Sequence, residues 1–381
     1  MKTAGIITEF NPFHNGHKYI IDKAKREHDA VVVIMSGSFV QRGEAAVTDK
    51  WTRAAAAIRN GADLVIELPV IYALNTAQKF AYGAIETLNK CGIVDDIVFG
   101  SESGNVDELI KAAELLENES QFISERVKKY MSLGMNYPSA REQAYTGIIN
   151  KEILSKPNNI LAVEYLRALL YTKSKMKPYT IQRTNDFHGM NLDNDIASAT
   201  AIRSLIMEGK DFSEYVPEPQ FDIYVMNRLD TALISILRMK TAGELKDIND
   251  VSEGLENRIA YAVMNADSFE EAAYMIKTKR YTLSRIRRVL LSSVLSLTSD
   301  LCSMPPSYIR VLGMNGIGRM LLREMKKKAA LPVVIKTADF AADDIFKAEI
   351  RATDFAALAC LKRDGRVGGK DYKISPVVIF S

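Results

Sequence analysis

Two histidines near the start of the chain form the pattern best suited to phosphate chemistry. His14 and His17 flank Asn15 and Gly16, and they follow an apolar run and a turn containing Pro12. This order predicts a short buried strand, a turn and then a helix that begins at the histidines. Free N–H groups and the positive end of the helix dipole favour a phosphate there, and each imidazole can donate a hydrogen bond to it. We interpret the segment as a polyphosphate site; a turn with two partly exposed histidines is the alternative.

A second segment, IASATAIR at 196–203, contains groups that could bind the same phosphates. Ser198 or Thr200 can cap a predicted helix, and Arg203 follows within that helix. Its hydroxyl and N–H groups can bind phosphate oxygens, and Arg203 can neutralise charge on a leaving pyrophosphate. Alone, the segment is better explained as an ordinary helix cap, but together with the histidine pair it favours bound ATP. The expected reaction is attack at the α-phosphate, in which positioning and charge neutralisation do most of the work and Lys18 could assist.

Alternating strand and helix patterns predict the scaffold that positions these residues. Apolar runs at 30–38, 63–69 and 93–99 are typical of buried strands, residues 179–183 suggest a last core strand, and helical patterns separate the first three. This alternation predicts an α/β fold with a doubly wound parallel sheet. Ligands bind at the carboxyl ends of strands in such sheets, so the loop at 36–44 is a further candidate site.

The chain is expected to have three parts. They are an α/β catalytic domain at 1–215 with a helical insertion at about 105–150, a helical and basic domain at 216–330, and a small α/β tail at 331–381. The first boundary falls in the turn-prone segment 215–219, after a polar, loop-like segment at 185–195. In the tail, strand-like runs at 332–335 and 374–380 flank a short predicted helix at 353–360, and the tail could pack back against the core.

Positive charge is concentrated between residues 277 and 328, where Asp300 and Glu324 are the only acidic residues. Such a segment can bind an RNA backbone, and aromatic residues such as Tyr281 and Tyr308 can stack on unpaired bases. A solvated charged face is the alternative. The residues expected to bind RNA are Lys279, Arg280, Arg285, Arg287, Arg288, Lys326 and Lys327.

The composition is that of an ordinary globular protein. The chain has 381 residues, and its net charge of +3 is too small to indicate nucleic-acid binding without the local clustering. Cys91, Cys302 and Cys360 lack metal-ligand spacing, which argues against a Cys-based metal site and fits a reducing cytoplasm. No apolar run approaches the ~18 residues of a membrane-spanning helix, and Glu9 interrupts the pattern of a signal peptide. We therefore expect a cytoplasmic protein without a membrane span.

Three motifs in this order resemble those of the bacterial tRNA(Met) cytidine acetate ligase family. They are EFNPFHNGH at 9–17, MSGSFVQRGE at 35–44 and DLVIELP at 63–69, and the similarity extends to about residue 330. HNGH is similar to the HxGH motif of the nucleotidylyltransferase superfamily, which implies a Rossmann-like sheet of the HUP type. The resemblance implies that ATP and acetate form acetyl-AMP, without acetyl-CoA. The acetyl group then passes to the exocyclic amine of the wobble cytidine in elongator tRNA(Met) and produces N4-acetylcytidine.

The resemblance also implies an ATP site, residue by residue. It comprises Ile7, Thr8, Glu9, Phe10, Asn11, Pro12, Phe13, His14, Asn15, Gly16, His17, Lys18, Tyr19, Ile20, Gly100, Asn158 and Arg183. Thr8 departs from the family pattern in a tolerable way. Gly100 and Asn158 could equally be a turn glycine and a helix cap. Gln41, Arg42 and Lys50 are candidates for the acyl or base pocket. Mg²⁺ is expected as the usual partner of ATP, although no carboxylate cage is evident.

The residues themselves leave the attacking group open. A phosphate as the attacking group would make the protein a small-molecule adenylyltransferase, whereas a carboxylate would make it an adenylate-forming ligase. The long basic helical extension argues against the first reading. A catalytically silent RNA-binding protein is the third, and the intact HNGH and SATAIR segments argue against it.

Overall fold

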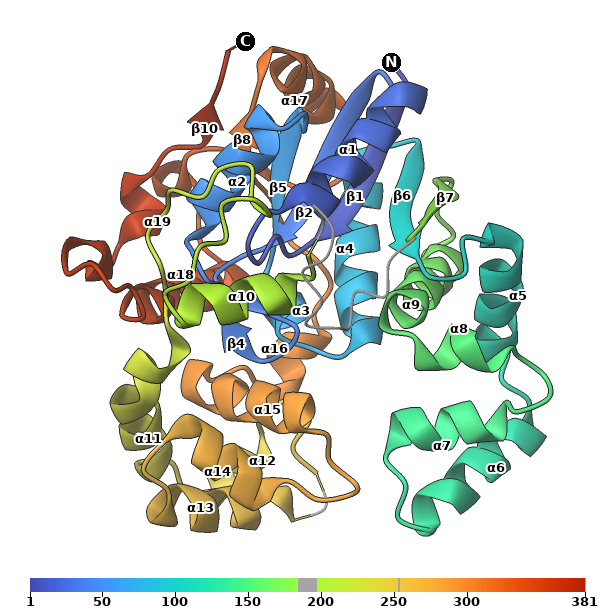
Figure 1. Cartoon of the computed structure of the whole chain (residues 1–381), viewed down its shortest axis with the longest axis vertical. Helices are drawn as coiled ribbons and strands as arrows, with labels where there is room; N and C mark the ends of the chain where they lie inside the picture. Colours follow the sequence, from blue (N-terminus) through green and yellow to red (C-terminus); the bar gives the residue numbers. More distant parts are fainter. Residues whose placement is uncertain (184–196, 253, 381) are drawn as a thin grey trace.

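The computed structural model describes residues 1–183, 197–252 and 254–380 (Figure 1). The polar loop expected at 185–195 lies outside these residues. A mostly parallel sheet forms the centre of the molecule, in the spatial order β10, β8, β5, β2, β1, β6 and β7, with β9 paired to β8. Its strands are β1 (Thr3–Thr8), β2 (Ala30–Ser36), β5 (Leu64–Leu68), β6 (Asp96–Ser101), β7 (Lys177–Gln182), β8 (Ile309–Met314), β9 (Val333–Val334) and β10 (Val377–Val378).

The expected doubly wound sheet is confirmed. Neighbouring strands among β5, β2, β1, β6 and β7 pair in parallel. Every residue of β1, β2 and β5 is buried, as expected for parallel strands covered on both faces. β2 and β6 lie on opposite sides of β1, so the direction of winding reverses between β1 and β6.

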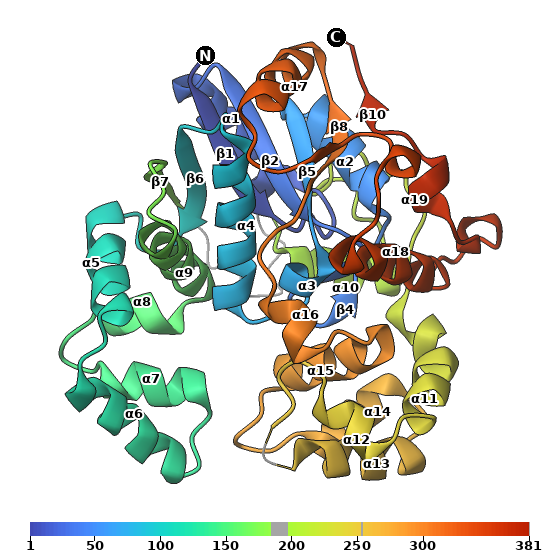
Figure 2. The same ribbon diagram turned by 180° about the vertical axis from the view of Figure 1, so that it is seen from behind.

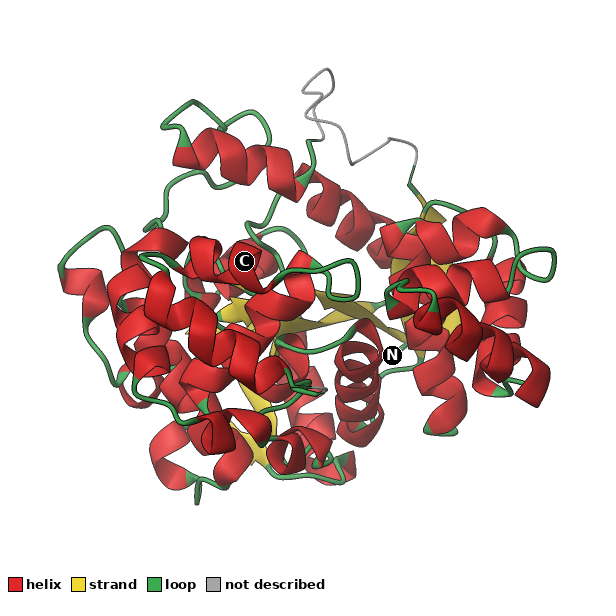
Figure 3. Cartoon of the chain, turned by 90° about the horizontal axis from the view of Figure 1, so that it is seen from below, coloured by secondary structure: helices red, strands yellow, loops and turns green. Residues whose placement is uncertain are grey.

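Helices cover both faces of the sheet, as the view from below shows (Figure 3). Because side chains alternate along a strand, Ile6 and Val33 belong to one apolar cluster, whereas Ile7 and Ile34 belong to another. The first cluster is completed by α1 (Asn15–Glu27) and α2 (Lys50–Arg59). The second is completed by α4 (Ala77–Cys91), α9 (Pro157–Tyr171) and α17 (Gly316–Lys328).

The helical insertion expected at 105–150 is present between β6 and β7. It contains α5 (Val106–Glu117), α6 (Gln121–Ser132) and α7 (Tyr137–Ala144), followed by α8 (Lys151–Ser155). In Figure 1, α6 and α7 extend away from the sheet at the lower right.

A second helical region lies at the lower left of Figure 1. It contains η1 (Met226–Leu229), α11 (Asp230–Arg238), α12 (Ala242–Lys246), α13 (Leu255–Asn265), α14 (Phe269–Ile276), α15 (Leu283–Leu295) and α16 (Ser299–Ser303). The expectation that helices continue to residue 330 is wrong at β8, which pairs antiparallel with β5 in the main sheet. All six residues of β8 are buried, so the apolar run within a basic segment marks a core strand.

The tail returns to the sheet (Figure 2), as its sequence allowed. It comprises β9, η2 (Thr337–Asp339), α18 (Asp344–Ala357), η3 (Asp364–Arg366), α19 (Lys370–Lys373) and β10. β10 pairs in parallel with β8. The helix predicted at 353–360 begins nine residues earlier, at Asp344, because Asp343 caps it there. Within the described residues, no helix is both long and apolar enough to cross a membrane.

Candidate active site

A cavity of about 390 Å³ lies at the carboxyl ends of β1 and β6. The winding direction reverses at this point of the sheet, which is where open α/β sheets bind ligands. The lining residues are Ile6, Ile7, Thr8, Glu9, Phe10, Asn11, His14, His17, Ile20, Gln41, Arg42, Ala77, Phe80, Phe99, Gly100, Pro157, Asn158, Ile160, Leu161, Tyr165, Arg183, Ser198, Ala199, Thr200 and Arg203. The structure therefore brings the two sequence motifs, 180 residues apart, to one cavity.

The two histidines are held by the first turn of α1. His14 is the N-cap, and its Nδ1 accepts a hydrogen bond from the Gly16 N–H at 3.1 Å. Nδ1 of His17 accepts from the His14 N–H at 3.2 Å, and the ring centroids are 3.7 Å apart. Because Nδ1 accepts in both rings, each neutral imidazole carries its proton on Nε2. The pair thus supplies two N–H donors beside the free end of a helix.

Burial keeps both imidazoles neutral. Desolvation lowers the pKa of His14 to about 3, and the positive charges of Arg183 and Arg203 contribute. Desolvation also lowers the pKa of His17 well below its usual value, with His14 and Arg183 as further causes. At neutral pH the histidines therefore donate hydrogen bonds without adding positive charge.

Aromatic residues before the helix fix the position of His17. Phe10 and Phe13 are buried, and their ring centroids lie 4.8 and 5.9 Å from that of His17. Phe10 adopts a positive φ of 48°, and the following Asn11–Pro12 bond is cis. The turn directs the chain from β1 into α1 while both phenyl rings face the histidine.

The start of α10 (Ala199–Met207) brings hydroxyl and guanidinium groups to the cavity. Ser198 caps the helix by accepting from the Ala201 N–H at 3.1 Å. Thr200 Oγ1 accepts from Arg42 Nη1 at 3.2 Å and from Arg203 Nη2 at 3.4 Å. Arg203 also donates to the Asn11 carbonyl at 2.9 Å, which ties α10 to the turn before α1. Two guanidinium groups thus meet at one hydroxyl beside the cavity.

A third guanidinium comes from the end of β7. Arg183 Nη1 donates to Asn158 Oδ1 at 2.5 Å, and Asn158 Nδ2 donates to Glu102 Oε1 at 2.7 Å. A Cβ on Gly100 would lie 3.2 Å from the Arg183 side chain, so the glycine makes room for it. Gly100 lies within β6 and Lys156 is the N-cap of α9, so neither alternative suggested for Gly100 and Asn158 describes the structure.

The hairpin β3 (Phe39–Val40) and β4 (Glu44–Ala45) carries Gln41 and Arg42 to the cavity. The Gln41 N–H donates to the carboxylate of Glu9 at 2.7 Å. Burial raises the pKa of Glu9, although this hydrogen bond opposes the shift. Glu9 is the only acidic side chain among the described lining residues.

Several expected site residues lie outside the lining. In α1, the lining residues are His14, His17 and Ile20, which share one helix face at a spacing of three. Lys18 points elsewhere and pairs with Asp22 at 2.9 Å. The other expected residues outside the lining are Pro12, Phe13, Asn15, Gly16, Tyr19 and Lys50. Lys50 is fully buried in an ion network of its own.

The lining also includes residues that the sequence analysis missed. They are mainly apolar and include Ile6, Ala77, Phe80, Phe99, Pro157, Ile160, Leu161, Tyr165 and Ala199. Ile6 and Ala199 adjoin the two motifs, in β1 and α10. Nothing in the sequence distinguishes the others from ordinary core positions, and only the packing of α4, α9 and β6 places them at the cavity.

The expected RNA-binding residues do not form a single patch. In α15, Arg285 pairs with Asp250 at 3.0 Å and Arg287 pairs with Glu270 at 2.6 Å. Lys326 and Lys327 lie in the last turn of α17, and Figures 1 and 2 show α17 and α15 at opposite ends of the molecule. Lys279 and Arg280 remain exposed just before α15.

Arg288, which was expected to bind RNA, makes a contact within the protein. It donates to the backbone carbonyl of Gln41 at 3.1 Å and thereby connects α15 to the hairpin at the cavity.

No group of three or more His, Cys, Asp or Glu side chains could hold a metal ion, as far as the described part of the chain extends. The three cysteines are buried and unpaired with one another.

Comparisons with known proteins agree with this geometry. A family model described as HIGH Nucleotidyl Transferase matches residues 1–367. The chain is 39% identical to the tRNA(Met) cytidine acetate ligase of Clostridium novyi, and the match covers 100% of both chains. The corresponding protein of Thermoanaerobacter sp. is also 39% identical, over 99% of this chain and 100% of the relative.

The solved structures agree as well. A crystal structure of Thermotoga maritima TmcAL bound with alpha-thio ATP superposes with a TM-score of 0.90 at 32% identity, and the match covers 100% of both chains. The apo structure of that protein gives a TM-score of 0.91, with the same identity and coverage. The structural likeness includes the tail, because the match covers the whole chain. The chain belongs to the tRNA(Met) cytidine acetate ligase family, within the HIGH nucleotidyl transferases.

Proposed function

We propose that this protein is an ATP-dependent ligase that joins acetate to the exocyclic amine of the wobble cytidine of elongator tRNA(Met). The observation that carries the proposal is the cavity at the winding reversal, where two neutral histidines and three guanidinium groups surround one space. A relative with the same fold has been crystallised with an ATP analogue. The protein would act in the cytoplasm, where its tRNA substrate occurs, and would not use acetyl-CoA.

The cavity can hold ATP with its phosphates between the histidines and the start of α10. Nε2–H of His14 and of His17 would donate to phosphate oxygens, and Arg42 and Arg203 would neutralise the charge of the leaving pyrophosphate. The apolar wall that includes Phe99 and Leu161 suits the adenosine. Since Glu9 is the only carboxylate among the described lining residues, a Mg²⁺ ion arriving with ATP would be held mainly by the phosphates.

The reaction proposed for this site has two steps. A carboxylate oxygen of acetate attacks the α-phosphorus, the bond to the β-phosphate oxygen breaks, and acetyl-adenylate and pyrophosphate result. The cytidine amine then attacks the acetyl carbon, loses a proton and releases AMP as N4-acetylcytidine forms. Positioning in line with the leaving group accounts for the first step, so no nucleophilic side chain is required.

The test is incubation of the protein with labelled acetate, ATP and bulk tRNA, while pyrophosphate and labelled RNA are measured. We expect label in RNA only when ATP is present, and no stimulation by acetyl-CoA. Pyrophosphate release that depends instead on a phosphorylated metabolite would identify a small-molecule adenylyltransferase. If neither labelled RNA nor pyrophosphate release is observed, the protein would be an RNA-binding protein without this activity.

Replacement of one histidine tests the assignment of the site. His17→Ala removes a phosphate donor and should lower ATP–pyrophosphate exchange by about 100-fold or more. tRNA binding, measured by gel shift, should be unchanged. Arg26→Ala, on the exposed side of the same helix, is the matched control. Equal loss of exchange and of tRNA binding in His17→Ala would show that the histidine holds the fold instead.

A further inference from the structure

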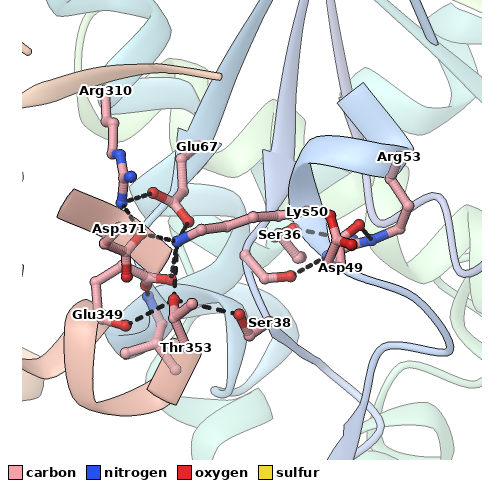
Figure 4. A network of polar contacts seen from close by, with 12 residues as sticks. Ser36, Ser38, Asp49, Lys50, Arg53, Glu67, Arg310, Glu349, Thr353 and Asp371 are labelled. Carbon is pink, nitrogen blue, oxygen red and sulfur yellow. Dashed lines mark hydrogen bonds and ion pairs between the residues drawn. The ribbon is translucent and has the colours of Figure 1, made fainter. Parts of the chain in front are cut away.

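A cluster of charged side chains lies buried outside the cavity, between the sheet and the tail (Figure 4). Lys50 Nζ contacts Glu67 Oε1 at 2.5 Å, Asp371 Oδ1 at 2.9 Å and Glu349 Oε1 at 3.5 Å. Arg310 Nη1 lies 3.0 Å from Glu67 Oε2 and 2.6 Å from Asp371 Oδ1. The side chains of Lys50, Glu67, Glu349 and Asp371 have no exposed surface. The cluster therefore joins α2, β5 and β8 to α18 and α19 of the tail.

The charges within this cluster balance. Burial, and next the carboxylate of Glu67, raise the pKa of Glu349 well above its usual value, which favours the neutral form of this side chain. Two cations, Lys50 and Arg310, then face two carboxylates, Glu67 and Asp371. Loss of one member of such a buried ion network leaves another charge uncompensated, which is strongly destabilising.

Thr353 on α18 connects the cluster to the loop after β2. Its Oγ1 accepts from Lys50 Nζ at 2.9 Å and from Ser38 Oγ at 3.3 Å, and it donates to the Glu349 carbonyl at 3.1 Å. The hydroxyl thus uses both lone pairs and its proton. Glu349 also packs directly on Gly37, where an added Cβ would overlap Glu349 Oε1. The tail therefore packs against Gly37 and hydrogen-bonds with Ser38.

The same loop leads to the cavity. Arg53 donates to the carbonyl of Gly37, to that of Ser36 at 3.0 Å and to that of Glu9 at 2.7 Å. Three residues beyond Ser38, Gln41 enters the lining and its N–H contacts the Glu9 carboxylate. An unbroken series of contacts thus runs from α18 to the cavity.

Loop 37–45 has little regular secondary structure, so contacts with other elements help to fix its position. Residues 37–45 contribute only the two-residue strands β3 and β4, which pair with each other and not with the main sheet. Burial of Phe39 and Val40 anchors β3 in the core, and side-chain contacts from Arg53, Arg288 and Thr353 fix the residues around it.

We propose that Thr353, acting through Ser38 and Lys50, is a positioning residue that holds loop 36–42. Held in this way, Gln41 and Arg42 face the phosphates of bound ATP, where the reaction occurs. The tail is thereby a working part of the adenylation site, although α18 and α19 do not line the cavity. The inference rests on the proposed function, because Gln41 and Arg42 matter only where ATP reacts.

The experiment compares Thr353→Val, which removes the hydroxyl at nearly constant volume, with Thr353→Ser, which keeps it. ATP–pyrophosphate exchange in the presence of acetate is measured well below the melting temperature of each variant. Thr353→Val should lower kcat by about tenfold, because a small displacement of a positioned group slows the reaction. KM for ATP should change by less than about twofold, because His14, His17 and Arg203 come from other elements. Thr353→Ser should restore kcat to near the wild-type value.

Ser38→Ala tests the route of the effect. It should lower kcat in the same way, and the double variant Ser38→Ala/Thr353→Val should be no slower than Thr353→Val alone. Lys347→Gln, which removes an exposed charge from α18, is the control. If Thr353→Val does not fold, Ser38→Ala provides the decisive measurement.

The inference is overturned if Thr353→Val and Ser38→Ala keep kcat within about twofold of wild type. It is also overturned if the double variant shows the full product of the two single losses. Absence of exchange in the wild-type protein would instead reject the proposed function, so the two failures are distinguishable.

Discussion

The histidines of the cavity are placed to act as neutral hydrogen-bond donors and not as cations. Their Nδ1 atoms are already used by backbone N–H groups of α1, and burial disfavours a second proton. In the proposed site, Arg42, Arg183 and Arg203 would therefore supply the side-chain positive charge near the triphosphate. Such an arrangement suits a site that releases pyrophosphate. The imidazole rings would orient the phosphates, and the guanidinium groups would stabilise the negative charge that develops on the leaving pyrophosphate.

At the residue scale, the low pKa of His14 makes the folded protein sensitive to acid. Below about pH 6.5 the unfolded chain takes up a proton on this ring, whereas the folded chain does not until about pH 3. The free energy of unfolding should therefore fall by about 1 kcal/mol between about pH 7.5 and 5.5 on account of His14. His14→Asn keeps a capping oxygen but removes the titrating group, so its stability should depend less on pH. Urea unfolding at several pH values measures this, and an identical dependence in both proteins would contradict it.

At the element scale, α15 connects two parts of the molecule. One side of it packs into the helical region, and Arg288 reaches the hairpin at the cavity. Arg285 and Arg287 form ion pairs with acidic side chains. The number of arginines in this segment therefore overestimates the positive charge available to bind RNA. Lys279 is exposed and better placed to contact phosphates, and the neighbouring Arg280 is exposed as well.

This arrangement predicts different effects for neighbouring basic residues. Lys279→Ala and Arg280→Ala should weaken tRNA binding, and each should reduce the salt slope of log K by about 1. Arg288→Ala should leave the salt slope unchanged but lower ATP–pyrophosphate exchange by about tenfold, because Gln41 loses its anchor. Binding isotherms at several salt concentrations and exchange assays measure the two effects. Lys347→Ala controls for the loss of one exposed charge, and an effect of Arg288→Ala on the salt slope would contradict the distinction.

At the scale of the whole molecule, the tail completes the sheet and the buried charge cluster. β10 extends the sheet beside β8, and Asp371 lies between Lys50 and Arg310. The chain therefore closes its core with residues from both ends of the sequence.

Removal of Asp371 should consequently destabilise the entire fold. Asp371→Ala leaves Lys50 and Arg310 short of one buried carboxylate, and the free energy of unfolding should fall by about 3 kcal/mol or more. Asp364→Ala, which removes an exposed carboxylate of the tail, should have little effect. Denaturant midpoints compare the two variants. Equal midpoints would show that the cluster contributes little to stability.

Local patterns in the sequence were sufficient for much of the architecture. Apolar runs and helical periodicity identified β1, β2, β5 and β6 and the helices between them, because secondary structure depends on near neighbours. β7 was expected as a core strand, but it lies at the edge of the sheet and its residues are exposed or half-buried. The histidine pair and the start of α10 were predicted as parts of a phosphate site for the same reason, since a helix start and its capping residues lie within one turn, and both line one cavity. The carboxyl edge of the sheet followed from the order of the strands.

Long-range packing settled the remaining features. Lys50 was considered for a ligand pocket, yet its contacts come from Asp371 and Thr353, the latter 303 positions away, and no local pattern reveals such partners. β8 joined the sheet through a pairing with β5 across more than 240 residues. Arg288 was expected to bind RNA, and no sequence pattern indicated its hydrogen bond to the Gln41 carbonyl. A charged side chain has the same sequence letter whether it meets solvent, RNA or a buried carboxylate, and only the folded chain determines which of these lies beside it.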